Sequence, residues 1–335
     1  MARAAVQRRL SWRLGRVTGR LDETPRVRTL VLAVPGWEGH RAGQHVDVRL
    51  TAADGYQAQR SYSIASAPED AEQVVLTIER IEDGEVSPYL VDELAEGDQL
   101  ELRGPIGGYF VWEVEMGGPL LLVAGGSGIC PLMAMLRHRA ARGSGVPTRL
   151  LYSSRAFEDV IYRVELDRLA GRADGLEVVH TLTRRRPSGW HGYARRIDRA
   201  MLAEVGVPPE QRPLCLVCGP TPLVELGHPP DRVKTERFGP TGGENMDETQ
   251  LRLDGNTTAG ILREVFVHEL STARGACASC GTIAAMGAQH LYMYPLAPGA
   301  VLRCSTCQEV LMVFVHAGGR YRLGLQGLTW LEMRA

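Results

Sequence analysis

The sequence predicts three domains: an antiparallel β-barrel, a doubly wound α/β domain and a small β-rich domain that carries four cysteines. Three observations favour this organisation. Short segments rich in β-branched residues alternate with turns in the first part of the chain. Strands and helices then alternate, which is typical of a parallel sheet. Two C-x-x-C pairs stand near the end of the chain.

The 335 residues provide enough chain for two or three domains, each with its own core. We expect the barrel over residues 1–113 and the α/β domain over 114–240. The glycine-rich stretch at 241–246 is the expected linker, and the third domain covers 247–335.

Charge balance and the apolar pattern exclude several kinds of partner and location. Lysine and arginine total 38 and aspartate and glutamate 39, a net charge of −1, so nucleic acid or an anionic membrane is not an expected partner. The N-terminus has no secretory signal pattern. The longest apolar stretch, which starts at Pro119, is far shorter than the ~20 residues of a membrane span. We expect a cytoplasmic protein, in which paired cysteines indicate a metal.

In the barrel, β-branched segments predict strands at 27–34, 45–50, 62–66 and 74–81, and one helical segment at 87–94. In the α/β domain the pattern predicts strands and helices in alternation. The strands are expected at 119–125, 148–154, 176–183 and 214–219, and the helices at 131–142, 164–171 and 197–205.

The segment QRSYSIAS suits a flavin nucleotide. Arg60, Tyr62 and Ser63 lie close together on one predicted strand. An arginine can hold a phosphate through two hydrogen bonds, an aromatic ring can stack on the isoalloxazine, and a hydroxyl can bond near flavin N5. The alternative is an ordinary half-exposed strand.

Two later turns support the flavin interpretation. Residues 84–87 open the predicted helix of the barrel, and a helix N-terminus binds anions. The Gly/Pro turn within residues 102–110 indicates that backbone approaches another group closely there.

A second glycine-rich turn, GGSGICP at 125–131, follows a buried strand and opens a helix. Its glycines permit close approach of backbone, Ser127 offers a hydroxyl, and Pro131 suits the first helical turn. This pattern predicts a pyrophosphate site, and the alternative is a tight strand–helix turn with no ligand.

Together these motifs resemble those of the ferredoxin–NADP reductase superfamily, which carries R-x-Y-S, G-x-x-S, G-P-x-G-x-F, G-G-x-G-x-x-P and C-G-P in this order. The resemblance covers residues 12–239. It implies a flavin-binding barrel, with FAD favoured over FMN, and a domain that binds NAD(P)H. The flavin-binding residues it implies are Arg60, Tyr62, Ser63, Ile64, Gly84, Val86 and Ser87. The nucleotide-binding residues it implies are Gly125, Gly126, Ser127, Gly128, Cys218, Gly219 and Pro220.

The resemblance also implies the reacting centre. It puts Cys218 beside the nicotinamide and brings Glu236 and Phe238 near both rings, so Ser63, Cys218 and Glu236 are the candidate catalytic residues. The chain departs from the family in residues 221–234, which are too few for a helix of three turns before the last strand. Either that helix is stunted or the last strand is displaced.

The residues after the second strand of the α/β domain bear on the choice of nucleotide. Ser154 and Arg155, with the arginines at 184–186 later, suit a 2′-phosphate and favour NADPH. Asp159 could serve NADH instead.

Cys277, Cys280, Cys304 and Cys307 form two C-x-x-C knuckles, a spacing that closes a tetrahedral site of four thiolates. Expected short strands at 290–296, 310–318 and 321–325 indicate a zinc-ribbon-like domain. Zinc is favoured. Iron, in a rubredoxin-like carrier, is the alternative, although the second knuckle lacks the rubredoxin C-P-x-C-G. A plant-type iron–sulfur cluster is excluded by spacing.

The resulting hypothesis is an enzyme in which hydride passes from NAD(P)H to FAD and electrons leave to a separate redox protein. A ferredoxin, a haem protein or a molybdenum oxidoreductase could be that acceptor. Two alternatives stay open: an electron-input or assembly subunit whose metal domain docks a partner, and a rubredoxin-like iron carrier fused to the reductase. The sequence does not predict an oligomeric state.

Overall fold

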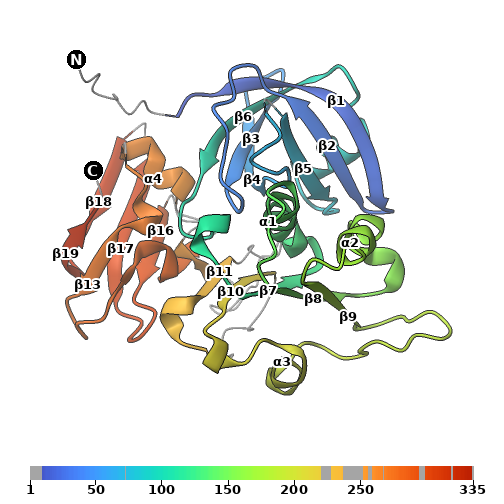
Figure 1. Ribbon diagram of the computed structural model, residues 1–335. Coiled ribbons are helices and arrows are strands. Elements are labelled where there is room, and N and C mark those ends of the chain that lie inside the picture. Colours follow the sequence, from blue (N-terminus) through green and yellow to red (C-terminus); the bar gives the residue numbers. More distant parts are fainter. Residues whose placement is uncertain are drawn as a thin grey trace, which may run out of the picture. The chain divides into compact units, whose positions relative to one another are not determined.

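The computed structural model describes residues 10–71, 73–219, 228–236, 252–255, 259–266, 268–293, 299–317 and 320–333. The chain divides into two compact units. The larger unit comprises Arg13–Pro105 and Val111–Gly242. The C-terminal unit comprises Met1–Trp12, Ile106–Phe110 and Gly243–Ala335. Figure 1 follows the chain through both. The predicted linker and the candidates Pro220 and Phe238 lie outside the described residues.

Six strands form the first lobe of the larger unit. In chain order they are β1 (Arg13–Thr24), β2 (Val27–Ala33), β3 (His45–Thr51), β4 (Gln57–Ser63), β5 (Gln73–Glu79) and β6 (Gln99–Ile106). Their order in the sheet is β4-β3-β6-β1-β2-β5. An isolated bridge joins Ile64, just after β4, to Leu76 of β5, so the two edge strands meet. The predicted antiparallel barrel is confirmed. The prediction of a strand at 62–66 has the wrong bounds, because β4 covers Gln57–Ser63 and the chain then turns toward β5.

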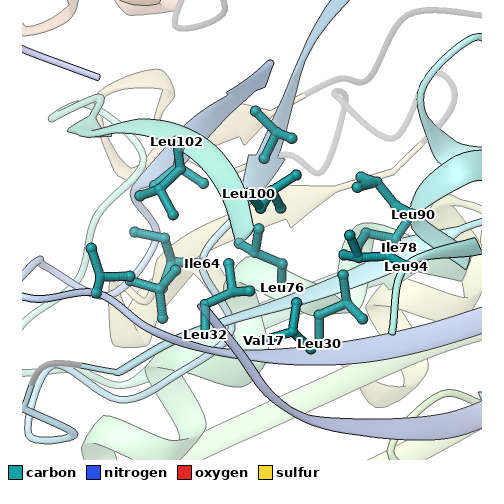
Figure 2. Close-up of a cluster of buried hydrophobic side chains, with 14 of the residues drawn as sticks. Val17, Leu30, Leu32, Ile64, Leu76, Ile78, Leu90, Leu94, Leu100 and Leu102 are labelled. Carbon is teal, nitrogen blue, oxygen red and sulfur yellow. The ribbon is translucent and has the colours of Figure 1, made fainter. Parts of the chain in front are cut away.

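The barrel core follows from the two-residue period of its strands. Leu30 and Leu32 of β2 and Leu76 and Ile78 of β5 point inward and are fully buried (Figure 2). The helix predicted at 87–94 is a single turn of π-helix, η1 (Tyr89–Glu93). It buries Leu90 in the same core, which fixes the end of the turn at 84–87 against the barrel.

The second lobe is a five-stranded parallel sheet in the order β11-β10-β7-β8-β9. The strands are β7 (Leu120–Gly125), β8 (Thr148–Ser154), β9 (Leu176–Leu182), β10 (Leu214–Cys218) and β11 (Val233–Glu236). The helices are α1 (Ile129–Ala141), α2 (Arg163–Ala170) and α3 (Arg199–Val205). Figure 1 shows α3 across the sheet from α1 and α2, which confirms the predicted doubly wound arrangement.

The last strand of this sheet is in place. β11 pairs with β10 in parallel from Cys215↔Val233 to Cys218↔Glu236. Of the two alternatives, a displaced last strand is therefore excluded, because four consecutive residue pairs hold β11 at the edge of the sheet. The stunted helix expected before it falls largely on residues 220–227, outside the described part of the chain.

Polar contacts join the two lobes of the larger unit. The Tyr162 hydroxyl donates to Thr77 Oγ1 in β5, and the Tyr162 N–H donates to Glu23 Oε2 in β1 over 3.1 Å. Arg137 of α1 donates to the Ala65 carbonyl over 2.7 Å. Because α1 lies between the sheet and the barrel, it is buried along most of its length.

No helix of the described residues is long and apolar enough to cross a membrane.

The C-terminal unit is rich in β-structure, as predicted, and its described residues include the α-helix α4 (Ala259–Val265). Its sheet of five strands has the order β12-β15-β16-β17-β18, and its sheet of three has the order β14-β13-β19. The first comprises β12 (Arg252–Asp254), β15 (His290–Met293), β16 (Gly299–Arg303), β17 (Val310–Ala317) and β18 (Arg320–Gly324). The second comprises β13 (Arg274–Cys277), β14 (Ile283–Ala285) and β19 (Leu328–Glu332).

The five residues Ile106–Phe110 belong to the C-terminal unit, although Ile106 is the last residue of β6. The Gly107 N–H donates to Glu269 Oε2 over 3.3 Å, and the Gly108 N–H donates to Ser271 Oγ over 3.1 Å. A Cβ on Gly108 would lie 3.0 Å from Thr272 Cγ2. Backbone thus approaches another group closely here, but that group is the segment 269–272, so the role of the Gly/Pro turn in a flavin site stays a prediction. The predicted boundary at residue 113 stays a prediction.

Candidate functional site

Three strand ends meet at one carboxylate. Ser63 ends β4 in the barrel, while Cys218 and Glu236 end β10 and β11 in the parallel sheet. Ser63 Oγ donates to Glu236 Oε2 over 3.5 Å, and Cys218 Sγ lies 3.7 Å from the same oxygen. All three residues are buried. The structure thus brings together the three candidate catalytic residues, at the carboxyl ends of parallel strands where ligands bind in open α/β sheets.

The candidate phosphate end of the flavin site combines β4 with the turn at 84–87. Arg60 is half exposed and its guanidinium pairs with Glu85 Oε2 at 3.1 Å. Ser87 Oγ accepts a hydrogen bond from the Ile81 N–H over 3.1 Å. A Cβ on Gly84 would lie 3.0 Å from Ser87 Oγ, so the tight turn favours glycine there. Arg60 therefore stands beside the turn, where a phosphate could replace Glu85 as its partner.

The other flavin candidates are buried to different extents. Burial raises the pKa of Tyr62 well above its ordinary value, so its phenol is neutral. Ile64 and Val86 are fully buried in the barrel core. Their side chains serve packing, and only their backbone groups could reach a flavin.

The glycines of the turn at 125–131, and Gly219 opposite it, differ in their surroundings. Gly126 has a left-handed φ of 53°, and no atom lies within 4 Å of the position of a Cβ. A Cβ on Gly128 would lie 2.1 Å from the Cys218 carbonyl oxygen, and one on Gly219 would lie 2.9 Å from the Gly125 nitrogen. Gly128 and Gly219 thus let the ends of β7 and β10 touch. Gly126 leaves open space where α1 begins, which fits a phosphate at a helix N-terminus.

Ser127, in the same turn, has a partner that sequence patterns do not indicate. Its hydroxyl donates to Glu79 Oε2, at the end of β5 in the barrel, over 3.0 Å. No motif includes Glu79, and only the packing of the two lobes brings it to the turn.

The loops that follow β8 and β9 meet. The N–H groups of Arg184 and Arg185 donate to the Arg155 carbonyl over 2.8 and 3.1 Å. Arg155 and the three arginines at 184–186 are exposed, whereas Ser154 is buried. The guanidinium groups are thus available to a ligand at this edge, although Arg185 pairs with Glu158 at 2.7 Å.

The four cysteines of the C-terminal unit converge. The sulfur atoms of Cys277, Cys280, Cys304 and Cys307 all lie within 4.8 Å of one another. The distances Cys277–Cys307 and Cys280–Cys304 are both 3.7 Å. A tetrahedral ion with bonds of ~2.3 Å to sulfur needs sulfur atoms about 3.8 Å apart.

The two knuckles have the same local geometry. The Cys277 carbonyl accepts the Gly281 N–H over 2.9 Å, and the Cys304 carbonyl accepts the Gln308 N–H over 3.0 Å. Hydrogen bonds with the Thr282 side chain and backbone lower the pKa of Cys280 to about 6. The pKa of Cys307 is raised to about 12, against a hydrogen bond from the Glu309 backbone, by burial and by the neighbouring sulfur atoms. The case for a metal therefore rests on the positions of the four sulfur atoms. The four residues therefore fit a metal ion.

Comparisons with known proteins agree with these sites. Residues 16–111 match the oxidoreductase FAD-binding domain, and residues 122–228 match the oxidoreductase NAD-binding domain. Ferredoxin–NADP reductase B of Sorangium cellulosum is 35% identical over 209 residues, which cover 59% of this chain and 84% of that protein. The chain belongs to the ferredoxin–NADP reductase family. The resemblance found in the motifs is confirmed.

Other similar proteins differ in the share of their length that this chain covers. The glycine betaine monooxygenase reductase subunit of Pseudomonas aeruginosa is 32% identical over 214 residues, or 61% of this chain and 57% of that subunit. The chain thus spans little more than half of that relative. The solved Amycolatopsis cytochrome P450 reductase GcoB has a TM-score of 0.60 and 26% identity, covering 69% of this chain and 71% of that one. Residues 246–335 match a family of unknown function, DUF6510.

Proposed function

We propose that the protein is an oxidoreductase that takes hydride from NAD(P)H onto FAD and passes electrons to a separate redox protein. The observation that carries this proposal is the meeting of Ser63 with Cys218 and Glu236, because it joins a flavin-binding lobe to the ligand edge of a nucleotide-binding sheet. FAD, when bound, supplies the two-electron chemistry.

The protein's own residues orient the two rings and exclude water. Ser63 and Cys218 are buried and share the Glu236 carboxylate, so each has a fixed orientation before ligands arrive. Tyr62, with its neutral phenol, would cover the flavin ring, and Arg60 with the N–H groups of the 84–87 turn would bind its pyrophosphate. The open space at Gly126 would take the pyrophosphate of the nicotinamide nucleotide.

NADPH is the proposed donor. The exposed guanidinium groups of Arg155 and of residues 184–186 stand at one edge of the sheet and suit a 2′-phosphate. The burial of Ser154 leaves the arginines as the main ligands. Asp159, the candidate for NADH, offers a single carboxylate against four cationic side chains in this region.

The acceptor is proposed to be the redox protein of an oxygenase system. Two relatives are named as a monooxygenase reductase subunit and a cytochrome P450 reductase. A haem protein or a ferredoxin therefore fits better than a molybdenum oxidoreductase. A cytoplasmic location is proposed with it, because clustered cysteines stay reduced and available to a metal in a reducing compartment.

The four cysteines are proposed to hold one zinc ion that stabilises the C-terminal unit. Two of them are buried beside Leu311, and a closed site of four thiolates is typical of structural zinc. An iron ion would make the unit a one-electron carrier, and metal analysis of purified protein separates the two.

Anaerobic titration tests the proposal. The purified holoprotein should show a flavin spectrum that bleaches on addition of NADPH. NADH should bleach the flavin less. Protein that binds flavin yet is not bleached by either nucleotide would favour an electron-input or assembly subunit instead.

A further inference from the structure

A carboxylate stands at the turn that is expected to receive the nucleotide pyrophosphate. Ser127 Oγ, in the turn between β7 and α1, donates to Glu79 Oε2 over 3.0 Å. Glu79 is the last residue of β5, where its backbone pairs with Val27 of β2. The side chain is thus carried by the barrel and reaches the turn across the junction of the two lobes.

The negative charge of Glu79 is not neutralised by an ion pair among the described residues. The neighbouring Arg80 is directed to Asp92, with Nε 2.7 Å from Oδ2. The hydroxyl of Ser127 is therefore the partner that the structure gives to this carboxylate.

A serine hydroxyl has one proton to donate. It cannot donate to Glu79 and to a phosphate oxygen at the same time. A phosphate at the N-terminus of α1 would also lie within one side chain of the Glu79 charge, and two anions repel at that distance. Binding of a pyrophosphate must therefore take Ser127 from Glu79 and work against its charge.

We propose that Glu79 is a positioning residue that lowers the affinity of the reductase for dinucleotides. It holds Ser127 while the site is empty and repels the pyrophosphate when it binds, which favours release of the oxidised nucleotide. The inference rests on the proposed function. Because the pyrophosphate is common to NADP⁺ and NAD⁺, Glu79 lowers the affinity for both nucleotides by the same factor.

Equilibrium binding to the oxidised holoprotein tests this role without turnover. ADP-ribose, NADP⁺ and NAD⁺ are titrated by calorimetry into the wild type and Glu79→Gln. Glutamine retains an oxygen that can accept from Ser127, so the substitution removes the charge and keeps the contact. The dissociation constants of all three ligands should fall by a common factor, roughly fivefold, and less at high salt.

Two further variants make the test decisive. Glu96→Gln removes an equivalent charge from an exposed position of the same lobe and should leave the constants unchanged. Glu79→Ala should also tighten binding if the charge is the cause. It replaces Glu79→Gln in the measurement if the glutamine variant folds poorly. Unchanged or weaker binding by both Glu79 variants would overturn this role alone. Absence of ADP-ribose binding by the wild type would overturn the proposed function as well.

Discussion

Cys215 and Cys218 lie on the same strand but in different surroundings. Cys215 packs in the apolar cluster of the parallel sheet with Met201 and Leu202 of α3. Cys218, three residues later, contacts the Glu236 carboxylate. Because side chains alternate along a strand, residues three apart face opposite sides of the sheet. One cysteine is thus a packing residue, and the other belongs to the candidate reacting centre.

This difference predicts that replacing Cys218 affects the reaction rate, whereas replacing Cys215 affects only stability. Cys218→Ala should slow flavin reduction by NADPH by roughly 10- to 100-fold with FAD retained, because the nicotinamide loses a side chain that positions it. Cys215→Ala should leave that rate unchanged and lower the free energy of unfolding by about 1 kcal/mol. Anaerobic stopped-flow bleaching and thermal unfolding measure the two effects. Equal rate losses in both variants would remove Cys218 from the reacting centre.

Lys234, the one lysine of the chain, should make the free energy of unfolding depend on pH. Burial, with the positive charges of Arg41 and Arg232, lowers its pKa to about 8. The unfolded chain titrates near 10.4 at this residue. Between these values the folded protein binds fewer protons than the unfolded chain, so the contribution of Lys234 to stability rises with pH.

Lys234→Met should therefore be most favourable at neutral pH, where the wild type carries the full cost of a buried cation. The variant's advantage in free energy of unfolding should shrink by about 1 to 3 kcal/mol between pH 8 and 10.5. Denaturant unfolding of both proteins at several pH values measures this difference, and other titrating groups cancel in the comparison. A difference that is constant with pH would contradict the account.

The four-cysteine site predicts one tightly held zinc ion per chain. Cys304→Ala should lose the ion and destabilise the C-terminal unit, since Cys304 is buried in the site. Elemental analysis and calorimetry measure both effects, with Cys215→Ala as a control that keeps its zinc. Iron in stoichiometric amount, or a red protein, would instead support the carrier.

The contact between Gly287 and Tyr109 predicts a steric effect within the C-terminal unit. A Cβ on Gly287 would lie 2.7 Å from the Tyr109 ring, so Gly287→Val should lower the unfolding temperature of this unit, with a cost of about 1 to 3 kcal/mol. Gly324→Val is the matched control, because its Cβ would lie 3.9 Å from Val313. Calorimetry compares the two, and equal stabilities would show that residues 106–110 do not pack as described.

Local patterns predicted much of the fold. Strand–helix alternation located β8 at 148–154 to the residue, and the knuckle spacing located the four-cysteine site. These features depend on neighbours in the sequence or on a fixed spacing, which a single sequence displays.

Other features depend on contacts between distant residues. The pairing of Ser127 with Glu79 and of Gly108 with Ser271 joins residues 48 and 163 positions apart. Neither Glu79 nor Ser271 belongs to a motif, and nothing near them in the sequence marks a partner. The position of Glu236 beside Cys218 followed from the family resemblance, and the shortened segment before it left two alternatives open, a stunted helix or a displaced strand. The pairing of β11 with β10 is what places Glu236 there.

In the proposed function, hydride passes from the nicotinamide to the flavin beside Ser63, Cys218 and Glu236. Single-turnover bleaching of the holoprotein with NADPH and with NADPH deuterated at C4 of the nicotinamide tests it most directly. Bleaching should be slower with the deuterated donor, and slower again in Glu236→Gln. Flavin that keeps its oxidised spectrum with both donors would contradict it.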